Sequence, residues 1–222
     1  MYPIIKRFFD IIFSLLALLI LLPFLLPIVI LLKLTGEGYV FYFQKRIGHY
    51  SKPFDIWKFA TMLKDSPNTG TGLITLRKDP RITPMGGFLR MTKINELPQI
   101  INVLKGDMSF VGPRPLVEKN FLTTPKLVKD EIYQNKPGIT GIGSVVFRDE
   151  EKLLSDTKMP PEQFYNEIIM PYKSELEIWY GKNMSFMTDL KILVLTVLVI
   201  LMPKNSLYNA WFKNLPQSSI IN

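Results

Sequence analysis

One stretch limits what this chain can fold into more than any other. From Ile11 to Leu32 no residue is charged, and Ser14 carries the only hydroxyl group. This run meets the requirement of about 20 apolar residues for a helix that crosses the hydrocarbon core of a bilayer. It is too long for the apolar region of a signal peptide, and no small-residue cleavage site follows it. We therefore expect residues 1–35 to form a membrane helix.

The charges on either side of this run do not orient it across a bilayer. Lys6 and Arg7 precede the run, while Lys33, Lys45 and Arg46 follow it. The positive-inside rule therefore favours neither direction. A helix that enters the membrane and returns to the same face would satisfy both flanks.

Two prolines, Pro23 and Pro27, lie in the second half of the run. Each removes a backbone hydrogen bond and tends to kink a helix. The residues leave two interpretations open: a re-entrant helix that breaks at a proline, and a membrane-spanning anchor with a mild kink.

Composition limits the chemistry that the rest of the chain can perform. Lys and Arg outnumber Asp and Glu by 27 to 19, so the partner is expected to be anionic: nucleic acid, anionic lipid or a phosphorylated substrate. There is no cysteine, which excludes disulfides, thiolate zinc sites and thiol nucleophiles. His49 is the single histidine, which argues against a catalytic triad and a multi-histidine metal site. A metal would need carboxylate and phosphate oxygens, which points to magnesium. The membrane run and the lack of a nucleic-acid-binding motif argue against nucleic acid.

The stretch from Arg90 to Pro115 has the pattern of a short amphipathic helix between two arginines. Asn95 occupies the position of an N-cap, and Glu96 lies in the expected first turn, where the helix dipole favours an anion. Lys105 and Gly106 are typical of a helix end. The apolar positions recur with a helical spacing at Leu97, Ile100, Ile101 and Leu104.

Phosphate groups suit both helix N-termini and arginine side chains, and Arg90 and Arg114 flank this helix. The rigid Gly112–Pro115 turn would fix the direction of Arg114. A simpler interpretation remains: Asn95 caps the helix, Glu96 balances its dipole, and the arginines are surface charges.

Residues 93–115, KINELPQIINVLKGDMSFVGPRP, resemble the signature of the bacterial sugar transferases, the monotopic phosphoglycosyl transferases, which is close to LDELPQ…NVLKGDMS…GPRP. Further blocks match the family in the same order: VFYFQKRIG (residues 40–48), KFATM (58–62), DPRIT (79–83) and KPGITG (136–141).

The resemblance implies a monotopic membrane protein of the bacterial inner membrane. Its small, mainly helical α/β domain would lie on the cytoplasmic face, held by a re-entrant membrane helix that breaks at Pro23. It also implies transfer of a sugar-1-phosphate from a UDP-sugar to undecaprenyl phosphate, with Mg²⁺ and release of UMP, at the start of a surface glycan such as an exopolysaccharide.

The resemblance assigns roles to particular residues. Lys58, Arg90, Arg114 and Arg148 match positions that bind substrate phosphate. Glu96 matches the second member of an Asp-Glu pair and a ligand of Mg²⁺. Surface roles are the alternative: a solvated strand end for Lys58, and an ion pair with acidic neighbours for Arg148.

The pair itself departs from the family, because Asn95 stands where the nucleophilic aspartate is expected. An amide has no anionic oxygen at neutral pH and is a poor nucleophile. Three outcomes remain open: Glu96 attacks instead, the lipid phosphate attacks directly, or the protein is a catalytically silent scaffold of a glycan assembly complex.

The remaining segments complete the expected organisation. We expect strands over residues 40–43 and 54–59, a loop over 63–77, and helices over 116–135 and 159–184. The apolar part of 189–202 is too short to span a bilayer and is expected to be buried or to lie in the interface. The predicted units are the membrane helix (1–35), a catalytic domain (36–185), and an interfacial helix with its tail (186–222). Whether copies of the chain associate is left open.

Overall fold

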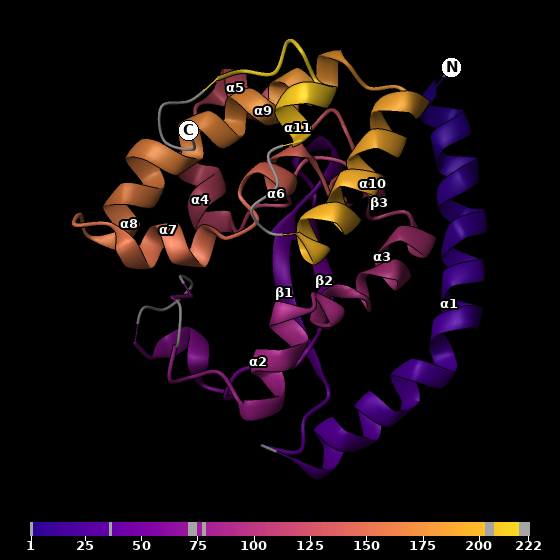
Figure 1. Cartoon of the computed structure of the whole chain (residues 1–222), viewed down its shortest axis with the longest axis vertical. Coiled ribbons are helices and arrows are strands. Elements are labelled where there is room, and N and C mark those ends of the chain that lie inside the picture. The colour runs from indigo at the N-terminus through magenta and orange to yellow at the C-terminus, as the bar shows by residue number, and fades with distance from the viewer. Residues whose placement is uncertain (1, 36, 71–74, 77–78, 203–206, 218–222) are drawn as a thin grey trace.

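A computed structural model of the chain describes residues 2–35, 37–70, 75–76, 79–202 and 207–217. The described part is mainly helical with two small sheets, which agrees with the predicted fold class in its coarse form (Figure 1). The helices that surround the site and the core are α2 (Pro84–Met91), α3 (Gln99–Lys105), α4 (Glu118–Thr123), α5 (Lys126–Ile132), α6 (Ile142–Val146), α7 (Glu150–Asp156), α8 (Pro161–Phe164) and α9 (Met170–Lys182).

The predicted membrane helix is present as α1 (Tyr2–Leu34), which is long and apolar enough to cross a membrane. Only 6% of its most apolar window is buried, so most of this apolar surface has no protein cover. Figure 1 shows α1 running along one side of the molecule and bending in its second half, the half that contains Pro23 and Pro27. The helix continues through Pro23, so the re-entrant break at this residue stays a prediction.

Both ends of α1 contact the same folded body. Near its start, Asp10 Oδ1 accepts hydrogen bonds from Ser109 Oγ at 3.0 Å and from the Phe110 amide at 3.2 Å. Near its end, Leu32 is buried in a cluster with Phe59 and Leu89. Both ends of the apolar run are therefore packed against one folded body.

The two predicted strands form an antiparallel hairpin, β1 (Phe41–Ile47) and β2 (Pro53–Phe59). The first strand is longer than expected, because it extends through residues 44–47. Ile56 and Phe59 of β2 are buried in two separate hydrophobic clusters, while Lys58 pairs across the hairpin with Tyr42. Of the predicted loop over 63–77, residues 71–74 and 77–78 lie outside the described residues.

A second sheet joins distant parts of the chain: β3 (Ser109–Val111) runs parallel to β4 (Gly138–Thr140). Parallel strands need a crossover connection, and α4 and α5 supply it. The Gly112 amide continues the pairing with a 2.9 Å bond to the Thr140 carbonyl. The segment after β3 is thereby held beside β4.

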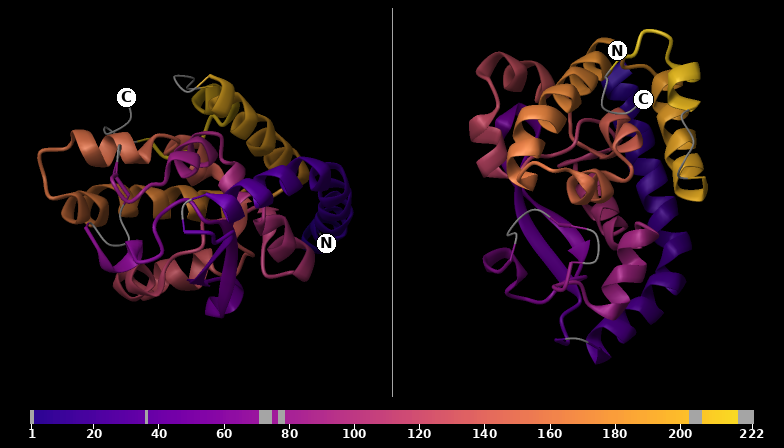
Figure 2. Two further views of the ribbon diagram at one scale, coloured as in Figure 1. Left: turned by 90° about the horizontal axis from the view of Figure 1, so that it is seen from below. Right: turned by 60° about the vertical axis from the view of Figure 1, so that its left-hand side comes forward.

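The largest core cluster lies around α6, α9 and the C-terminal helices α10 (Phe186–Leu201) and α11 (Leu207–Trp211). Leu176, Ile192 and Leu195 have no exposed surface. Segment 186–217 therefore shares one core with the preceding domain. The other face of α10 is exposed and apolar, with Phe186, Met187, Leu190, Val194, Val197 and Leu201. Figure 2 shows α10 next to α1, and Phe9 contacts Phe186 with ring centroids 5.8 Å apart.

Candidate active site

The signature stretch folds differently from the predicted capped helix. Asn95 is not an N-cap: it lies in a 3-10 turn, Ile94–Glu96, and α3 begins at Gln99 with Pro98 as its N-cap. The Glu96 amide bonds the Lys93 carbonyl three residues back, and the next amide bonds Ile94 in the same way. Such tight turns are common at helix starts, and this one carries the chain into α3 without a side-chain cap. The predicted end of the helix at Gly106 is confirmed, because this residue adopts a left-handed φ of 96°.

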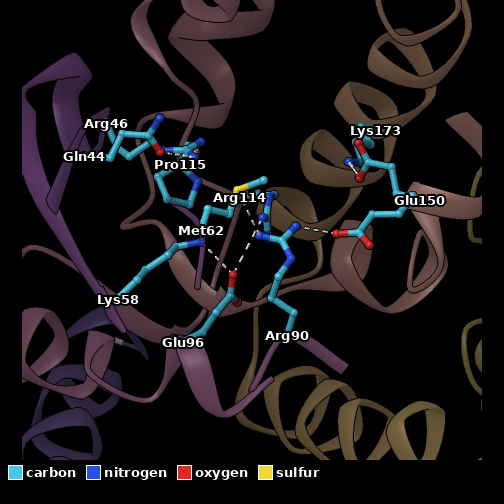
Figure 3. A network of polar contacts seen from close by, with 11 residues as sticks. Gln44, Arg46, Lys58, Met62, Arg90, Glu96, Arg114, Pro115, Glu150 and Lys173 are labelled. Atoms are coloured by element: carbon cyan, nitrogen blue, oxygen red, sulfur yellow. Dashed lines mark hydrogen bonds and ion pairs between the residues drawn. The ribbon is translucent and has the colours of Figure 1, made fainter. Parts of the chain in front are cut away.

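Two cationic side chains converge on Glu96, as Figure 3 shows. Lys58 Nζ lies 2.7 Å from Glu96 Oε1, and Arg114 lies 3.9 Å from the same oxygen. Lys58 comes from β2, Glu96 from the turn before α3, and Arg114 from the segment after β3. The side chains of Lys58 and Glu96 are only 15% and 14% exposed, so little solvent screens their interaction.

The surrounding charges set the ionisation of this group. Burial by itself would raise the pKa of Glu96, but Lys58, Arg114 and Lys93 outweigh it and hold the pKa well below its ordinary value. Burial also lowers the pKa of Lys58, to about 8, although Glu96 opposes this change. At neutral pH we therefore expect a carboxylate beside an ammonium and a guanidinium group.

These residues line a small pocket. Its described lining consists of Arg46, Ile56, Lys58, Glu96, Gln99, Arg114, Pro115, Gly138 and Ile139. Asn95 is not among them. It is 6% exposed, and its Oδ1 atom has no hydrogen-bond partner among the described residues. The acidic member of the Asn95-Glu96 pair thus faces the pocket, and the amide is buried beside it.

Arg114 is positioned by a carboxylate that the sequence analysis missed. The Arg114 amide donates a 3.4 Å hydrogen bond to Glu177 Oε1 of α9. Glu177 is 7% exposed, and burial raises its pKa to about 7. Nothing in the sequence marked this residue, since an isolated glutamate in a helix is typical of a solvated face.

Arg46 of β1 is a second missed residue. Its Nε and Nη2 atoms donate to Gln44 Oε1 at 3.0 and 2.6 Å, and Nη1 donates to the Pro115 carbonyl at 3.1 Å. Burial and the nearby Arg114 lower the pKa of Arg46 to about 10. The sequence feature that could have identified Arg46 as a site residue is its position in the block QKRIG, which resembles the family.

The other two predicted phosphate ligands, Arg90 and Arg148, do not line this pocket. Arg90 Nη2 donates to Glu151 Oε1 at 2.5 Å. Arg148 Nη2 donates to the Met91 carbonyl, next to Arg90, at 3.0 Å. In both guanidinium groups the buried Nε atom has no partner among the described residues. The structure therefore brings together Lys58, Glu96 and Arg114, and places Arg90 and Arg148 as a neighbouring pair.

The described residues contain no cluster of three carboxylate or imidazole groups that could hold a metal by itself. Glu96 is the one carboxylate in the described lining of the pocket. Mg²⁺ is commonly held by one or two carboxylates together with substrate phosphates. The donor set therefore suits a magnesium ion that arrives with a phosphorylated substrate.

Comparison with known proteins gives a consistent result. The family model described as "Bacterial sugar transferase" matches residues 1–203. An uncharacterised sugar transferase of Bacillus subtilis, EpsL, is 36% identical over 198 residues, which cover 89% of this chain and 88% of that protein. The exopolysaccharide production protein ExoY of Sinorhizobium fredii is 31% identical over 90% of this chain and 87% of its own length.

A relative with a named reaction is longer. The UDP-glucose:undecaprenyl-phosphate glucose-1-phosphate transferase of Escherichia coli is 36% identical over 197 residues. The match covers 87% of this chain but 39% of that protein. The family model, which matches residues 1–203, includes both the site and α1.

Proposed function

Because this chain belongs to the bacterial sugar transferase family, we propose that it transfers a sugar-1-phosphate from a UDP-sugar to undecaprenyl phosphate and releases UMP. The product would start a surface glycan such as an exopolysaccharide. The observation that carries this proposal is the convergence of Lys58 and Arg114 on Glu96, in a pocket built from the signature stretch. Lipid and sugar substrates also agree with the names of the relatives.

The cations of the pocket would bind the diphosphate of the donor. Arg46, Lys58 and Arg114 line it, against a single carboxylate, so an empty pocket carries excess positive charge. Arginine forks and lysine ammonium groups are the usual partners of phosphate oxygens. As negative charge moves to the leaving UMP, the same groups would stabilise it. Arg90 and Arg148 would extend this surface.

We propose direct attack by the lipid phosphate. An oxygen of undecaprenyl phosphate would bond to the phosphorus that carries the sugar, and the bond between the two phosphates of UDP would break. Asn95 offers no anionic oxygen, and the carboxylate of Glu96 is held ionised by two cations, which makes it a weak base and nucleophile. A phosphate monoester, with a second pKa of about 6, is the more basic oxygen.

Magnesium is part of this proposal. Glu96 would be the protein ligand of an Mg²⁺ that the diphosphate brings, and the ion would neutralise phosphate charge. Lys58 would then move from Glu96 to a phosphate oxygen, which keeps its ammonium paired.

The membrane arrangement is proposed as re-entrant, with the site on the cytoplasmic face of the bacterial inner membrane. The contacts of Asp10 and Leu32 with one folded body support it, because both ends of the apolar run then lie on the same side. Polyprenyl phosphate keeps its phosphate at the interface, where a body held by such a helix would meet it. Nucleotide sugars are present on the cytoplasmic side.

The test compares UMP release with and without the lipid. Purified protein is given Mg²⁺ and a panel of UDP-sugars, first without and then with undecaprenyl phosphate. We expect no UMP without the lipid and multiple turnovers with it. A burst of UMP without the lipid, together with a phosphosugar on a Glu96 peptide, would establish covalent catalysis instead. Peptide mass spectrometry must show Asn95 as the intact amide, because hydrolysis to aspartate would restore a nucleophile.

One observation favours a second candidate, a membrane-bound scaffold that recruits other glycan enzymes. Asn95 stands where the resemblance places the attacking residue, and it is buried in the turn beside Glu96. The variant Asn95→Asp separates the two functions. If wild type binds nucleotide sugar without turnover and Asn95→Asp transfers sugar to the lipid, the scaffold is supported. Efficient turnover by wild type excludes it.

A further inference from the structure

A second cavity lies at the start of α1, outside the site already described. It is open to solvent and is larger than the site pocket. One face of α1 lines it with Lys6, Arg7 and Asp10. The opposite walls come from β3 and from the loop before β4, which includes Lys136. We call it the α1 cavity.

The charge of this cavity is positive. Lys6, Arg7 and Lys136 contribute three positive charges and Asp10 one negative charge, a formal balance of +2 with His49 neutral. Asp10 already accepts hydrogen bonds from Ser109 and from the Phe110 amide. Lys6 is paired with Asp189 of α10. Lys6 is therefore balanced from outside the lining, and Arg7 and Lys136 remain against the carboxylate of Asp10, a net charge of +1.

Arg7 and Lys136 lie close together. Arg7 Nη2 and Lys136 Nζ are 3.3 and 3.6 Å from the position that a Cβ atom on Gly106 would occupy. The described hydrogen bonds of Arg7 go to the neutral carbonyls of Val103 and Leu104. The carboxylate of Asp10 attracts Arg7 from a longer range, without a described ion pair. The ammonium of Lys136 makes no hydrogen bond or ion pair with the described residues. Burial and the charge of Arg7 lower the pKa of Lys136, and they outweigh the opposing effect of Asp10 and Asp107.

Two like charges in a half-buried cavity repel each other unless an anion lies between them. The guanidinium group of Arg7 has five N–H donors, and its bonds to the two carbonyls leave some of them available. The ammonium group of Lys136 has three donors, and none of them has a partner among the described residues. A phosphate group would accept from both. Gln134 and Asn135, whose side chains carry neutral N–H donors, belong to the same lining.

The position of the cavity indicates where such a phosphate would come from. Ile4 and Phe8, one turn apart on the neighbouring face of α1, are 78% and 61% exposed. Phe186 and Met187 of α10 are 51% and 55% exposed, and the rings of Phe9 and Phe186 are in contact. A charged cavity beside exposed apolar side chains matches an amphiphile whose headgroup is anionic.

We infer that the α1 cavity is a second anion site, which binds the phosphate group of a membrane phospholipid between Arg7 and Lys136. This anion site is separate from the site pocket, but the two are connected through the β3–β4 sheet. Ser109, which lines the cavity, pairs with Gly138, which lines the site pocket. The inference does not depend on the proposed transferase reaction, and its test needs no turnover.

The test uses the purified full chain in a neutral detergent. It is titrated with inorganic phosphate, with short-chain phosphatidylglycerol and with short-chain phosphatidylcholine, while melting temperature and heat of binding are recorded. Lys136→Gln removes the free ammonium. Lys126→Gln is the matched control, because Lys126 is also a lysine without a described partner and lies on the exposed face of α5.

We expect phosphatidylglycerol to raise the melting temperature of wild type and of Lys126→Gln, and Lys136→Gln to weaken binding about tenfold or more. Lys136→Arg should restore binding, which shows that charge and not folding was lost. The titration is repeated with the variant Arg114→Gln, in which phosphate binding to the site pocket is weakened, so that the remaining binding reports on the α1 cavity. If only inorganic phosphate shows the dependence on Lys136, the site exists but takes the free ion. Equal binding by wild type and Lys136→Gln would overturn the inference.

Discussion

Lys58 is a cation of the site pocket that loses its charge at mildly basic pH. Burial lowers its pKa to about 8, and its ammonium is the group closest to Glu96. Below this pKa Lys58 is charged and can bind phosphate; above it the positive charge is lost. We expect kcat/KM to fall as the pH rises through about 8, and Lys58→Arg to move this fall to higher pH, since arginine stays protonated. The measurement is a pH profile of UMP release for both proteins, and the same basic limb in both would contradict the assignment.

Glu96 supplies the carboxylate in the described lining of the site pocket. Glu96→Gln keeps the shape but removes the charge that pairs with Lys58 and would hold Mg²⁺. We expect turnover to fall about 100-fold or more, the usual cost of losing one charged group in an active site. Glu175→Gln, on the exposed face of α9, serves as the control and should transfer sugar like wild type. Unchanged turnover of Glu96→Gln would refute a role as nucleophile and as magnesium ligand together.

Helix α2 owes its position to a glycine rather than to its sequence pattern. A Cβ atom on Gly86 would lie 2.0 Å from the Thr61 carbonyl oxygen, whereas at the neighbouring Gly87 the nearest atom would be 4.0 Å away. The close approach holds α2, and with it Arg90, against the segment that follows β2.

The two glycines therefore give opposite predictions. Gly86→Ala should lower stability by about 1–3 kcal/mol, because the backbone must move apart. Gly87→Ala should be neutral or should raise stability by up to about 1 kcal/mol, because alanine loses less backbone entropy in a helix. Thermal melting of the purified variants in one detergent measures both. Equal melting temperatures for the two variants would show that the approach of α2 to Thr61 is not required.

The arrangement of the whole molecule around α1 can be tested by labelling, because the chain contains no cysteine. Ile4 and Leu34 lie near opposite ends of α1, and each is 78% exposed. We expect Ile4→Cys and Leu34→Cys to react with a membrane-impermeant maleimide from the same side of sealed membrane vesicles, as a re-entrant helix requires. Inverted vesicles of the same strain provide the control for sidedness. Reaction from opposite sides would establish a spanning helix and exclude the re-entrant arrangement.

Local patterns predicted most of the elements that surround the site. The apolar run predicted α1, the aromatic and β-branched runs predicted β1 and β2, and Lys105-Gly106 predicted the end of α3. These features depend only on residues that are close together in the sequence, and local sequence patterns therefore predict them. The start of α3 was predicted wrongly, because a cap and a tight turn have similar composition. The backbone hydrogen bonds of Glu96 and Leu97 decide between them.

The sequence by itself determined the class of the protein: an apolar helix, a basic domain without thiols, and an ordered set of family blocks around Asn95 and Glu96. Only the tertiary structure decided which groups meet. Lys58 and Glu96 are 38 positions apart and touch because β2 packs against the turn before α3. Glu177 and Arg114 are 63 positions apart and meet because α9 covers the end of β3. The charges of Arg7 and Lys136 are brought together by the packing of α1 on α3. Contacts of this kind depend on the path of the chain between the residues, and no local pattern records that path.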